Sequence, residues 1–433
     1  MGRDNFFWLT PQEAAYVINE LLQFGLIKYS NARDLPLKSG GKTDIYINLR
    51  EARSNPDAIA FLATVFFNPL LRLGIERFVE VPDSVSCFAG PLAIKSGLPY
   101  ITVRESAKEG RVAKAKVIGR AGRGEKVCII DDVITDGASK LSPYKECLSM
   151  GVKLLPLVVL VDRQQGWEET FKKLGVQMNV WAGMTLHDVR KYLIMNGIME
   201  RCDRGLEENN PLIVALDGME WDHILPIIDP LRTTGCILKV NDMLLNEGIK
   251  NIIPDLEVYG RVMADLKCHD IKNTVKNITT HLLPNPPWAV TVHASGGEEM
   301  IKAAVETLKD TPTKVLAVTV LTSISSTTCE EIYTRSPLDQ VKKLAGIAER
   351  AGAHGLVCSP EEVAELKSLY PKMIFVTPGI RSEGSDKGDQ KRVSTPEAAL
   401  ANGADYLVMG RQILGAADPV AEVTRLLKEE INV

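Results

Sequence analysis

The sequence ADLKCHDIKNT, residues 264–274, decides the fold of the second half of this chain. Apolar residues lead into it, as they do into a buried strand of a parallel sheet. Alternate residues of a strand share one face, so Asp265 and Lys267 are predicted on the same side, with Asp270 following in a loop. Barrel enzymes carry their catalytic residues at such a strand end, although a plain ion pair has the same pattern.

Seven further short apolar runs accompany this strand after residue 210, separated by segments able to form helices. Eight β/α units in succession are typical of a (β/α)8 TIM barrel. The runs cover residues 211–216, 235–240, 261–267, 288–293, 314–320, 355–358, 373–377 and 404–409. Polar residues stand at the ends of the runs, so we expect the C-terminal rim of the barrel to hold the site.

The strongest pattern in the first half is KVCIIDDVITDGAS, residues 126–139. It predicts a buried strand over residues 127–130 that ends in two carboxylates, Asp131 and Asp132. A tight loop and a helix beginning near Ser139 follow. Backbone N–H groups of such a loop, together with a helix N-terminus, bind phosphate. Paired carboxylates before the loop suit ribose hydroxyls or a magnesium-bound sugar pyrophosphate.

Composition excludes several classes of protein. A chain of 433 residues exceeds one hydrophobic core, so two or three domains are expected. A net charge of −4 does not indicate a nucleic-acid or polyanionic membrane partner. The eight cysteines lack paired spacing, so neither a disulfide framework nor a zinc site is predicted. No signal peptide and no run of eighteen apolar residues is found, so no membrane span is predicted and the cytoplasm is the expected location.

One stretch between the two halves has the character of a linker. Residues 197–210, GIMERCDRGLEENN, are polar, charged and without periodic pattern. We therefore predict a first domain over residues 1–200, a linker over residues 201–210 and a barrel over residues 211–433.

The second half resembles orotidine 5′-monophosphate decarboxylase along nearly its whole length. The similar motifs are ALD, LKVN, DLKCHD, TVHASGG, VLTS, TPGIRSEGSDKGDQKRV and YLVMGR. The resemblance implies that Lys267 stabilises and then protonates a carbanion at C6 of the pyrimidine, without a cofactor. It implies that Asp265 repels the substrate carboxylate and that Lys239 and Asp270 complete the charged array. In the family the second aspartate comes from the partner subunit, which implies a homodimer.

The same resemblance implies the substrate-binding residues and leaves one alternative. The implied residues are Asp217 and Thr322 near the ribose, Ser295 near the pyrimidine, and Arg381, Gln390, Gly410 and Arg411 around the 5′-phosphate. Ketogulonate-phosphate decarboxylases and hexulose-phosphate synthases share D-x-K-x-x-D in a barrel and use Mg²⁺. They lack the GIR segment, the long charged loop with Gln390 and the Lys239 partner in this form.

The first half resembles orotate phosphoribosyltransferase over roughly residues 10–200, which implies a type I phosphoribosyltransferase fold, a parallel sheet flanked by helices. The matching residues are Lys38, Tyr46, Arg104, Lys108, Asp131, Asp132, Thr135, Gly137, Ser139 and Arg163. Orotate and phosphoribosyl pyrophosphate (PRPP) are the implied substrates, and Mg²⁺ enters with PRPP, not on protein ligands. The catalytic loop departs from the family: residues 104–110 read RESAKEG, so Lys108 is the one catalytic lysine left and no histidine follows.

Together the two resemblances predict a bifunctional UMP synthase. Orotate and PRPP would give orotidine 5′-phosphate with Mg²⁺, and decarboxylation without a cofactor would give UMP. The alternative is that the decarboxylase alone is active and the first half is a PRPP- or nucleotide-binding or dimer-supporting module. The altered RESAKEG loop separates these hypotheses, and orotate consumption in the presence of PRPP and Mg²⁺ tests them.

Overall fold

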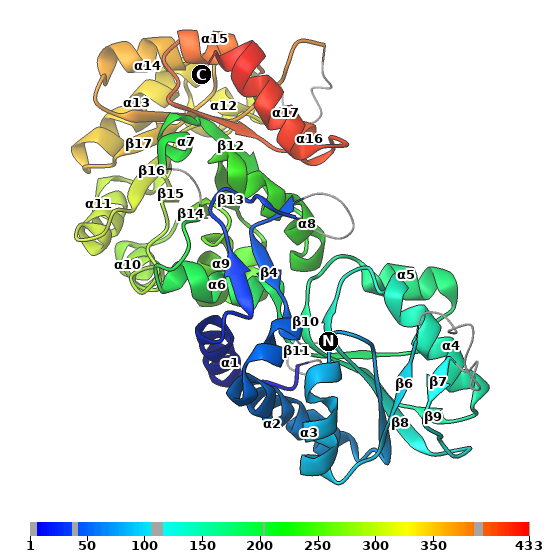
Figure 1. The fold of residues 1–433 in the computed structure, drawn as a ribbon. Helices are drawn as coiled ribbons and strands as arrows, with labels where there is room; N and C mark the ends of the chain where they lie inside the picture. Colours follow the sequence, from blue (N-terminus) through cyan, green and yellow to red (C-terminus); the bar gives the residue numbers. More distant parts are fainter. Residues whose placement is uncertain (1–6, 37–41, 105–115, 202–203, 385–392, 433) are drawn as a thin grey trace. The chain divides into compact units, whose positions relative to one another are not determined.

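The structure is a computed structural model that describes residues 7–36, 42–104, 116–201, 204–384 and 393–432. Three residues of the predicted sites, Lys38, Lys108 and Gln390, lie outside the described residues. The chain divides into two compact units, Met1–Glu200 and Arg201–Val433 (Figure 1).

The first unit is built on a seven-stranded sheet. Its strand order is β11-β10-β8-β5-β6-β7, with β9 beside β8. All pairs are parallel except β6 with β7. The strands are β5 (Arg77–Glu80), β6 (Tyr100–Val103), β7 (Val117–Ile118), β8 (Lys126–Ile134), β9 (Lys153–Leu154), β10 (Leu157–Asp162) and β11 (Val180–Thr185).

Helices cover both faces of this sheet, because alternate residues of its buried strands point to opposite sides. Cys128 and Ile130 of β8 belong to one apolar cluster, and Val127 and Ile129 belong to another. The first cluster is shared with α1 (Pro11–Gln23), α2 (Pro56–Leu73), α3 (Ser86–Ser96) and α6 (Leu186–Met195). The second is shared with α4 (Leu141–Ser149) and α5 (Trp167–Leu174).

Shorter elements complete the first unit. Two small antiparallel pairs join β1 (Ile27–Tyr29) to β4 (Ile45–Ile47) and β2 (Leu35–Pro36) to β3 (Lys42–Thr43). The short helix η2 (Leu49–Ser54) precedes α2, and η3 (Ala138–Lys140) precedes α4.

The helix α2 is long and strongly apolar. Among the described residues it is the one helix whose length and composition alone would let it cross a membrane. One face of the helix, including Leu62, Phe66 and Leu70, is buried in the core of the first unit, whereas Leu71 is exposed. The helix is therefore accounted for as a core helix.

The second unit is a closed barrel of eight parallel strands in chain order, with β12 paired to β19. The predicted TIM barrel is confirmed, and each strand falls within its predicted run except β14, which reaches one residue further. The strands are β12 (Leu212–Ala215), β13 (Ile237–Val240), β14 (Arg261–Cys268), β15 (Ala289–His293), β16 (Lys314–Val318), β17 (Gly355–Val357), β18 (Ile374–Thr377) and β19 (Tyr406–Met409).

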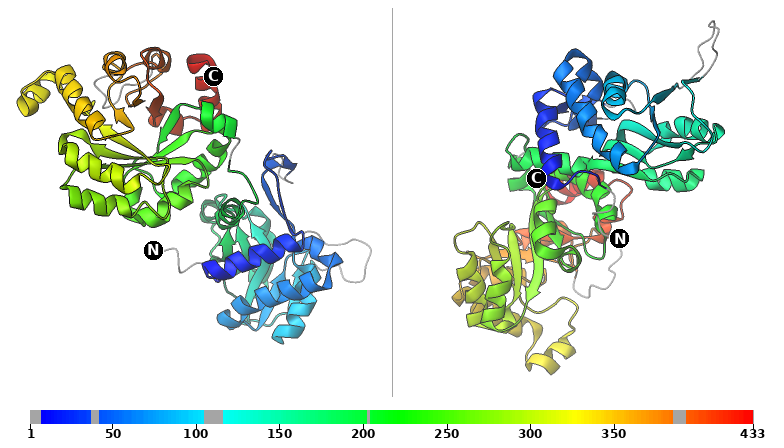
Figure 2. Two further views of the ribbon diagram at one scale, coloured as in Figure 1. Left: turned by 90° about the vertical axis from the view of Figure 1, so that its left-hand side faces the viewer. Right: turned by 90° about the horizontal axis from the view of Figure 1, so that it is seen from below.

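Helices lie outside the ring of strands (Figure 2). Apolar side chains fill the interior of the ring. Seven of the strands each contribute one buried residue to this filling: Ile213, Ile237, Met263, Ala289, Leu316, Val376 and Val408. The surrounding helices are α8 (Trp221–Leu231), α9 (Ile249–Leu256), α10 (Lys272–Thr280), α11 (Glu298–Leu308), α12 (Ser326–Tyr333), α13 (Pro337–Arg350), α14 (Val363–Leu369), α15 (Pro396–Ala401), α16 (Arg411–Leu414) and α17 (Pro419–Arg425). Short helical turns are η4 (Arg232–Thr234), η5 (Leu244–Gly248), η6 (Ala294–Gly296) and η7 (Leu426–Ile431).

Part of the predicted linker is helical. Residues 204–209 form α7 (Arg204–Asn209), which belongs to the second unit. Arg201 Nε lies 2.8 Å from Glu207 Oε1, and Asn210 Nδ2 donates to Thr234 O at 2.8 Å. At Gly235, where φ is +73°, a Cβ atom would come within 2.6 Å of the carbonyl carbon of Leu206. This close approach holds α7 against the turn that leads into β13.

Candidate active site

A bulge in β14 forms the centre of the site. Ala264 pairs with Val290 and Cys268 with Val292, so residues 265–267 of β14 lie opposite Thr291 alone. Lys267 has φ +47°, a left-handed conformation that residues with a Cβ seldom adopt. The regular strand predicted from the sequence is therefore corrected. A bulge, not plain alternation, brings the side chains of Asp265 and Lys267 together.

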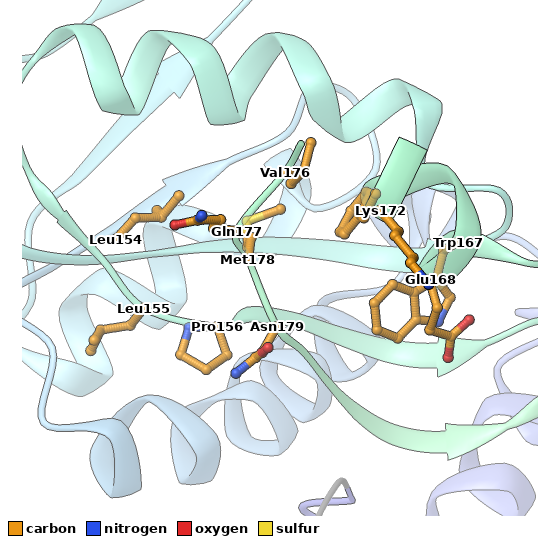
Figure 3. A pocket seen from close by; sticks show the side chains of 11 residues that line it. Leu154, Leu155, Pro156, Trp167, Glu168, Lys172, Val176, Gln177, Met178 and Asn179 are labelled. Carbon is orange, nitrogen blue, oxygen red and sulfur yellow. The ribbon is translucent and has the colours of Figure 1, made fainter. Parts of the chain in front are cut away.

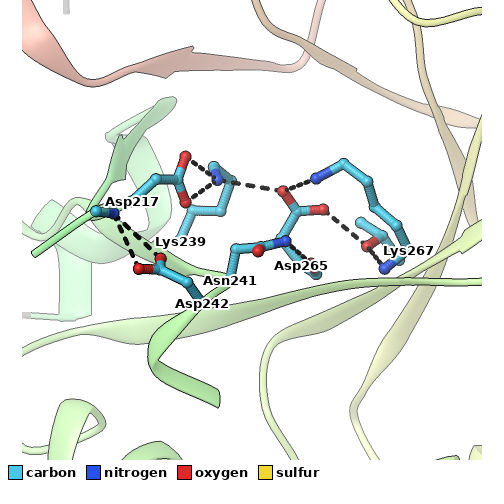
Figure 4. Close-up of polar contacts among 8 residues, drawn as sticks. Asp217, Lys239, Asn241, Asp242, Asp265 and Lys267 are labelled. Carbon is cyan, nitrogen blue, oxygen red and sulfur yellow. Dashed lines mark hydrogen bonds and ion pairs between the residues drawn. The ribbon is translucent and has the colours of Figure 1, made fainter. Parts of the chain in front are cut away.

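Four charged side chains then alternate in sign across three neighbouring strands (Figure 4). Lys239 Nζ lies 2.7 Å from Asp217 Oδ1 and 3.2 Å from Asp265 Oδ2. Asp265 Oδ2 also lies 2.6 Å from Lys267 Nζ. The two inner side chains, Lys239 and Asp265, are buried, whereas Asp217 is 51% exposed and Lys267 is 36% exposed. The array therefore exposes its two outer side chains and buries its two inner ones.

The protein surroundings keep Asp265 ionised. Burial alone would raise the pKa of Asp265, but the charges of Lys239 and Lys267 lower it. Hydrogen bonds from Lys267 and from the Thr291 hydroxyl, 2.8 Å from Asp265 Oδ1, act in the same direction, and the net pKa is below its usual value. The site thus holds a fixed negative charge between two cations.

Three further residues support this array, and the sequence reasoning missed them. Thr291 accepts a hydrogen bond from the Lys267 backbone N–H at 2.9 Å. Asn241 Nδ2 donates to the Asp265 carbonyl at 2.6 Å, and Asp242 accepts from the N–H of Gly218 at 3.1 Å. Asn241 stands two residues from the predicted Lys239, a strand spacing that could have identified it.

Asp270 lies outside the array in the single chain. It is exposed two residues before α10, and its Oδ1 accepts the N–H of Ile271 at 2.7 Å. That Asp270 contributes to the active site of a partner subunit stays a prediction.

The other predicted decarboxylase residues follow the C-terminal ends of barrel strands, on the same rim as the array. Ser295 lies in η6, with its hydroxyl 3.5 Å from His269 Nε2, and Thr322 lies in the turn after β16. Arg381 follows β18 and donates from Nη1 to the Ile380 carbonyl at 2.6 Å. Gly410 and Arg411 directly follow β19, and Arg411 is the first residue of α16. Gln390 is outside the described part of the chain.

In the first unit, the paired carboxylates lie within a strand. β8 was predicted to end at residue 130, but it continues to Ile134 because Asp131 and Val133 pair with β10. The Asp131 side chain is 1% exposed and forms an ion pair with the buried Lys140. Burial and the adjacent Asp131 charge raise the pKa of Asp132 to about 7. Lys140, which the sequence reasoning did not single out, therefore compensates the charge that the longer strand buries.

The predicted phosphate loop follows β8 directly. Thr135 Oγ1 lies 3.4 Å from Asp136 Oδ1, and Ser139 lies in η3. Gly137 has φ +77°, and a Cβ there would come within 2.6 Å of the Phe171 ring of α5. A glycine is therefore required at this turn.

The remaining predicted residues of the first unit lie on other elements. Arg163 follows β10 and donates from Nη2 to the hydroxyl of Thr43 at 3.3 Å. Thr43 lies three residues before Tyr46, which is on β4. The predicted residues Arg163 and Tyr46 therefore belong to neighbouring segments. Arg104 follows β6, with its N–H donating to the Lys116 carbonyl at 2.9 Å. Lys38 and Lys108 are outside the described ranges.

One hollow of the first unit lies apart from the predicted site residues. A hollow of about 520 Å³ lies beside α5 in the first unit and is lined by Trp167, Phe171 and Met178 among others (Figure 3). None of the predicted site residues lines it. Across the residues that the structure describes, no group of three or more His, Cys, Asp or Glu side chains is placed to hold a metal ion.

Comparison with known proteins identifies the second half. The family described as "Orotidine 5'-phosphate decarboxylase / HUMPS family" matches residues 210–426. Orotidine 5′-phosphate decarboxylase of Escherichia coli O139:H28 is 39% identical over 218 residues, 49% of this chain and 89% of the relative. The crystal structure of the same enzyme from Lactobacillus acidophilus has a TM-score of 0.45 and 35% identity, covering 51% of this chain and 99% of that one. Leishmania donovani UMP synthase has a TM-score of 0.37 and 25% identity, covering 43% and 39%.

The family match spans the whole barrel, from the strand that precedes Asp217 to the one that precedes Arg411. The chain therefore belongs to the orotidine 5′-phosphate decarboxylase / HUMPS family, and its second half is an orotidine 5′-phosphate decarboxylase domain of pyrimidine biosynthesis.

Proposed function

We propose that the array formed by Asp217, Lys239, Asp265 and Lys267 carries out the decarboxylation of orotidine 5′-phosphate to UMP. Decarboxylation breaks the bond between C6 and the carboxylate carbon, and the electron pair stays on C6 as CO₂ leaves. The ring offers no conjugated position for this pair, so a fixed cation must stabilise it. The observation that carries the proposal is the alternation of charge that aims Lys267 outward from a buried carboxylate.

Lys267 is the proposed proton donor. Its ammonium is partly exposed and stays close to Asp265, so it can reach a ligand at the rim without leaving the array. An ammonium near C6 stabilises the developing carbanion and then transfers a proton to it. The lysine, left neutral, regains its proton from water after the product departs.

Asp265 is proposed to destabilise the substrate carboxylate. It is buried and its pKa is lowered, so it remains charged when a second carboxylate arrives. Repulsion between the two carboxylates is relieved as CO₂ leaves, whereas both lysines remain in place. All of the charges in this scheme belong to the protein, and we propose that the step needs no cofactor.

Substrate binding is assigned to the rim. The reacting centre is small, so most binding energy must come from remote groups, chiefly the 5′-phosphate. We assign the phosphate to Gly410, Arg411 and Gln390 with Arg381 beside them, the ribose to Asp217 and Thr322, and the pyrimidine to Ser295.

A homodimer is part of the proposal. Asp270 is exposed and lies apart from the array of its own chain, and the neighbouring Ile271 is 70% exposed. We propose that this segment packs on a second copy and that Asp270 completes the partner's site.

The decarboxylase assignment is tested with purified protein and orotidine 5′-phosphate, by following conversion to UMP and CO₂. We expect turnover by the full chain without added metal. Absence of turnover in a folded sample that binds UMP would contradict the roles given to the array.

For the first half, we propose orotate phosphoribosyltransferase activity, so that the chain acts as a bifunctional UMP synthase. Support comes from a mostly parallel sheet with helices on both faces and from the DDVITDG sequence at the C-terminal end of β8. A strand end followed by a glycine turn is a common phosphate site. Orotate and PRPP would be the substrates, and Asp131, Asp132 and the loop would meet the ribose and 5′-phosphate.

One observation favours the second candidate, a module that binds PRPP or a nucleotide, or supports the dimer, without catalysing transfer. Asp131 is held by Lys140 and almost completely buried, so ribose hydroxyls would have to displace a buried ion pair to reach it. The same burial leaves Asp131 unsuited to hold Mg²⁺ directly, so Mg²⁺ would arrive on the PRPP pyrophosphate and neutralise its charge there.

The two candidates are separated by one pair of measurements on the full chain. We expect orotate, PRPP and Mg²⁺ to be converted to UMP, with orotidine 5′-phosphate as the intermediate. Retained PRPP binding in calorimetry with no orotate consumption would instead establish the non-catalytic module.

A further inference from the structure

We propose that Thr291 is a positioning residue for decarboxylation, which acts by holding Asp265 and Lys267 in the bulge of β14. The inference rests on the proposed role of Lys267. Thr291 is a buried residue in the middle of β15, and it is the single residue that faces the three residues 265–267. Its hydroxyl donates to Asp265 Oδ1 at 2.8 Å and accepts from the Lys267 N–H at 2.9 Å.

The bulge creates the need for this hydroxyl. In a regular parallel pair, the backbone of β15 would accept the N–H groups of β14, but the shift of register between Ala264 and Cys268 interrupts the ladder. The N–H of Lys267 is then satisfied by a side chain. A hydroxyl can accept from that N–H and donate to the carboxylate at the same time, which a methyl group cannot do.

The two hydrogen bonds fix the direction of both catalytic groups. Asp265 Oδ1 is occupied by Thr291, so Asp265 Oδ2 is the oxygen that remains for Lys239 and Lys267. Lys267 is held at φ +47°, which its Cβ disfavours, and the hydrogen bond to its N–H stabilises this conformation. Because Thr291 is fully buried, water has no ready access to replace it.

The test compares variants that keep or remove the hydroxyl. Thr291→Val keeps the shape and removes both hydrogen bonds, and Thr291→Ser keeps the hydroxyl. We expect Thr291→Val to lower kcat by about tenfold to a hundredfold, since one hydrogen bond to a charged group and one to a backbone N–H are lost. KM should stay within about threefold, because the phosphate-binding residues lie on other strands. Thr291→Ser should recover kcat to within about fivefold of the wild type.

Thr313→Val is the matched control. Thr313 is also buried, and its hydroxyl donates to the Pro287 carbonyl at 2.7 Å, but it precedes β16 at the opposite end of the barrel. Its loss should lower stability and leave kcat unchanged. If Thr291→Val does not fold, Thr291→Cys, whose thiol is a weaker donor and acceptor, takes its place.

Three results would overturn the positioning role: a kcat of Thr291→Val within twofold of the wild type, a Thr291→Ser variant as slow as Thr291→Val, or an equal kcat loss in Thr313→Val. Lys267→Ala, assayed in parallel, separates the two levels of the proposal. An inactive Lys267→Ala with a fully active Thr291→Val removes the positioning role alone. An active Lys267→Ala removes the mechanism on which it rests.

Discussion

The ammonium of Lys267 lies 2.6 Å from Asp265 Oδ2, and the two side chains differ in exposure, 36% against 7%. The pair is therefore a buried anion with a cation that reaches outward from it. A carboxylate-bearing ligand at the rim would meet Lys267 and be repelled by Asp265 at the same place.

Replacing Lys267 by alanine should abolish decarboxylation and leave UMP binding nearly intact. In the proposed mechanism the ammonium acts where charge develops on C6, whereas the phosphate is assigned to residues that follow other strands. We expect at least a thousandfold loss of kcat, measured by orotidine 5′-phosphate turnover, with UMP affinity measured by calorimetry. Lys272→Ala is the control, because Lys272 is exposed and its ion pair with Glu299 is long, at 3.9 Å. A Lys267→Ala variant within tenfold of the wild type would remove the assigned role.

Mixing two inactive variants, Lys267→Ala and Asp270→Ala, should restore part of the decarboxylase activity. If Asp270 serves the partner's site, a mixed dimer has one site with both changes and one with neither. Subunit exchange is verified with an affinity tag on one variant. Verified mixed dimers without recovered activity would show that Asp270 acts within its own chain.

Chelation should distinguish the two halves of the chain. The barrel array is built from lysines and aspartates, whereas PRPP presents its pyrophosphate as a magnesium complex. With excess EDTA we expect decarboxylation to persist and any orotate phosphoribosylation to stop. A decarboxylase that lost activity in EDTA and regained it with Mg²⁺ would instead resemble the Mg²⁺-dependent barrel enzymes.

The raised pKa of Asp132 predicts that the first unit loses stability as pH rises. Burial and the Asp131 charge raise its pKa from 3.8 to about 7, so the folded chain binds this proton more tightly than the unfolded chain. Below pH 4 both states are protonated and the penalty is absent. It grows between pH 4 and 7 and is constant above that range. Asp132→Asn removes this penalty. The difference between the Tm of the variant and that of the wild type should therefore be larger at pH 8 than at pH 4, by at least about 2 °C. A pH-independent difference in Tm would contradict the shift.

Lys140→Met should destabilise the first unit strongly, because it leaves the Asp131 carboxylate buried without a cation. Breaking one side of a buried pair typically costs about 3–5 kcal/mol, whereas removing both charges costs much less. The double variant Lys140→Met/Asp131→Asn should therefore recover most of the loss in calorimetric unfolding. Lys126→Met, at the exposed start of the same strand, is the control, and decarboxylase activity reports the second unit separately. A double variant no more stable than Lys140→Met would mean that lost packing, not the unpaired charge, causes the effect.

The sequence by itself predicts where the barrel strands lie along the chain. Short apolar runs at regular spacing specify eight barrel strands, because a strand of a parallel sheet is buried on both faces and must be apolar throughout. The position of Asp265 and Lys267 at a strand end, and of Asp217 and Lys239 at two others, follows from the same runs. A barrel brings its strand ends together on one rim, so the sequence predicts that these residues lie close to one another.

Register and burial were decided by the tertiary structure. The bulge that sets three residues of β14 opposite Thr291 depends on how two strands pair, and a pairing shift leaves no mark in the period of one strand. Likewise, β8 extends past Ile130 because β10 pairs with it and Lys140 neutralises Asp131, a contact made by a side chain from the following turn. The sequence by itself determined which residues reach the rim, whereas which of them are buried, paired and aimed at a ligand depended on neighbours that only the folded chain supplies.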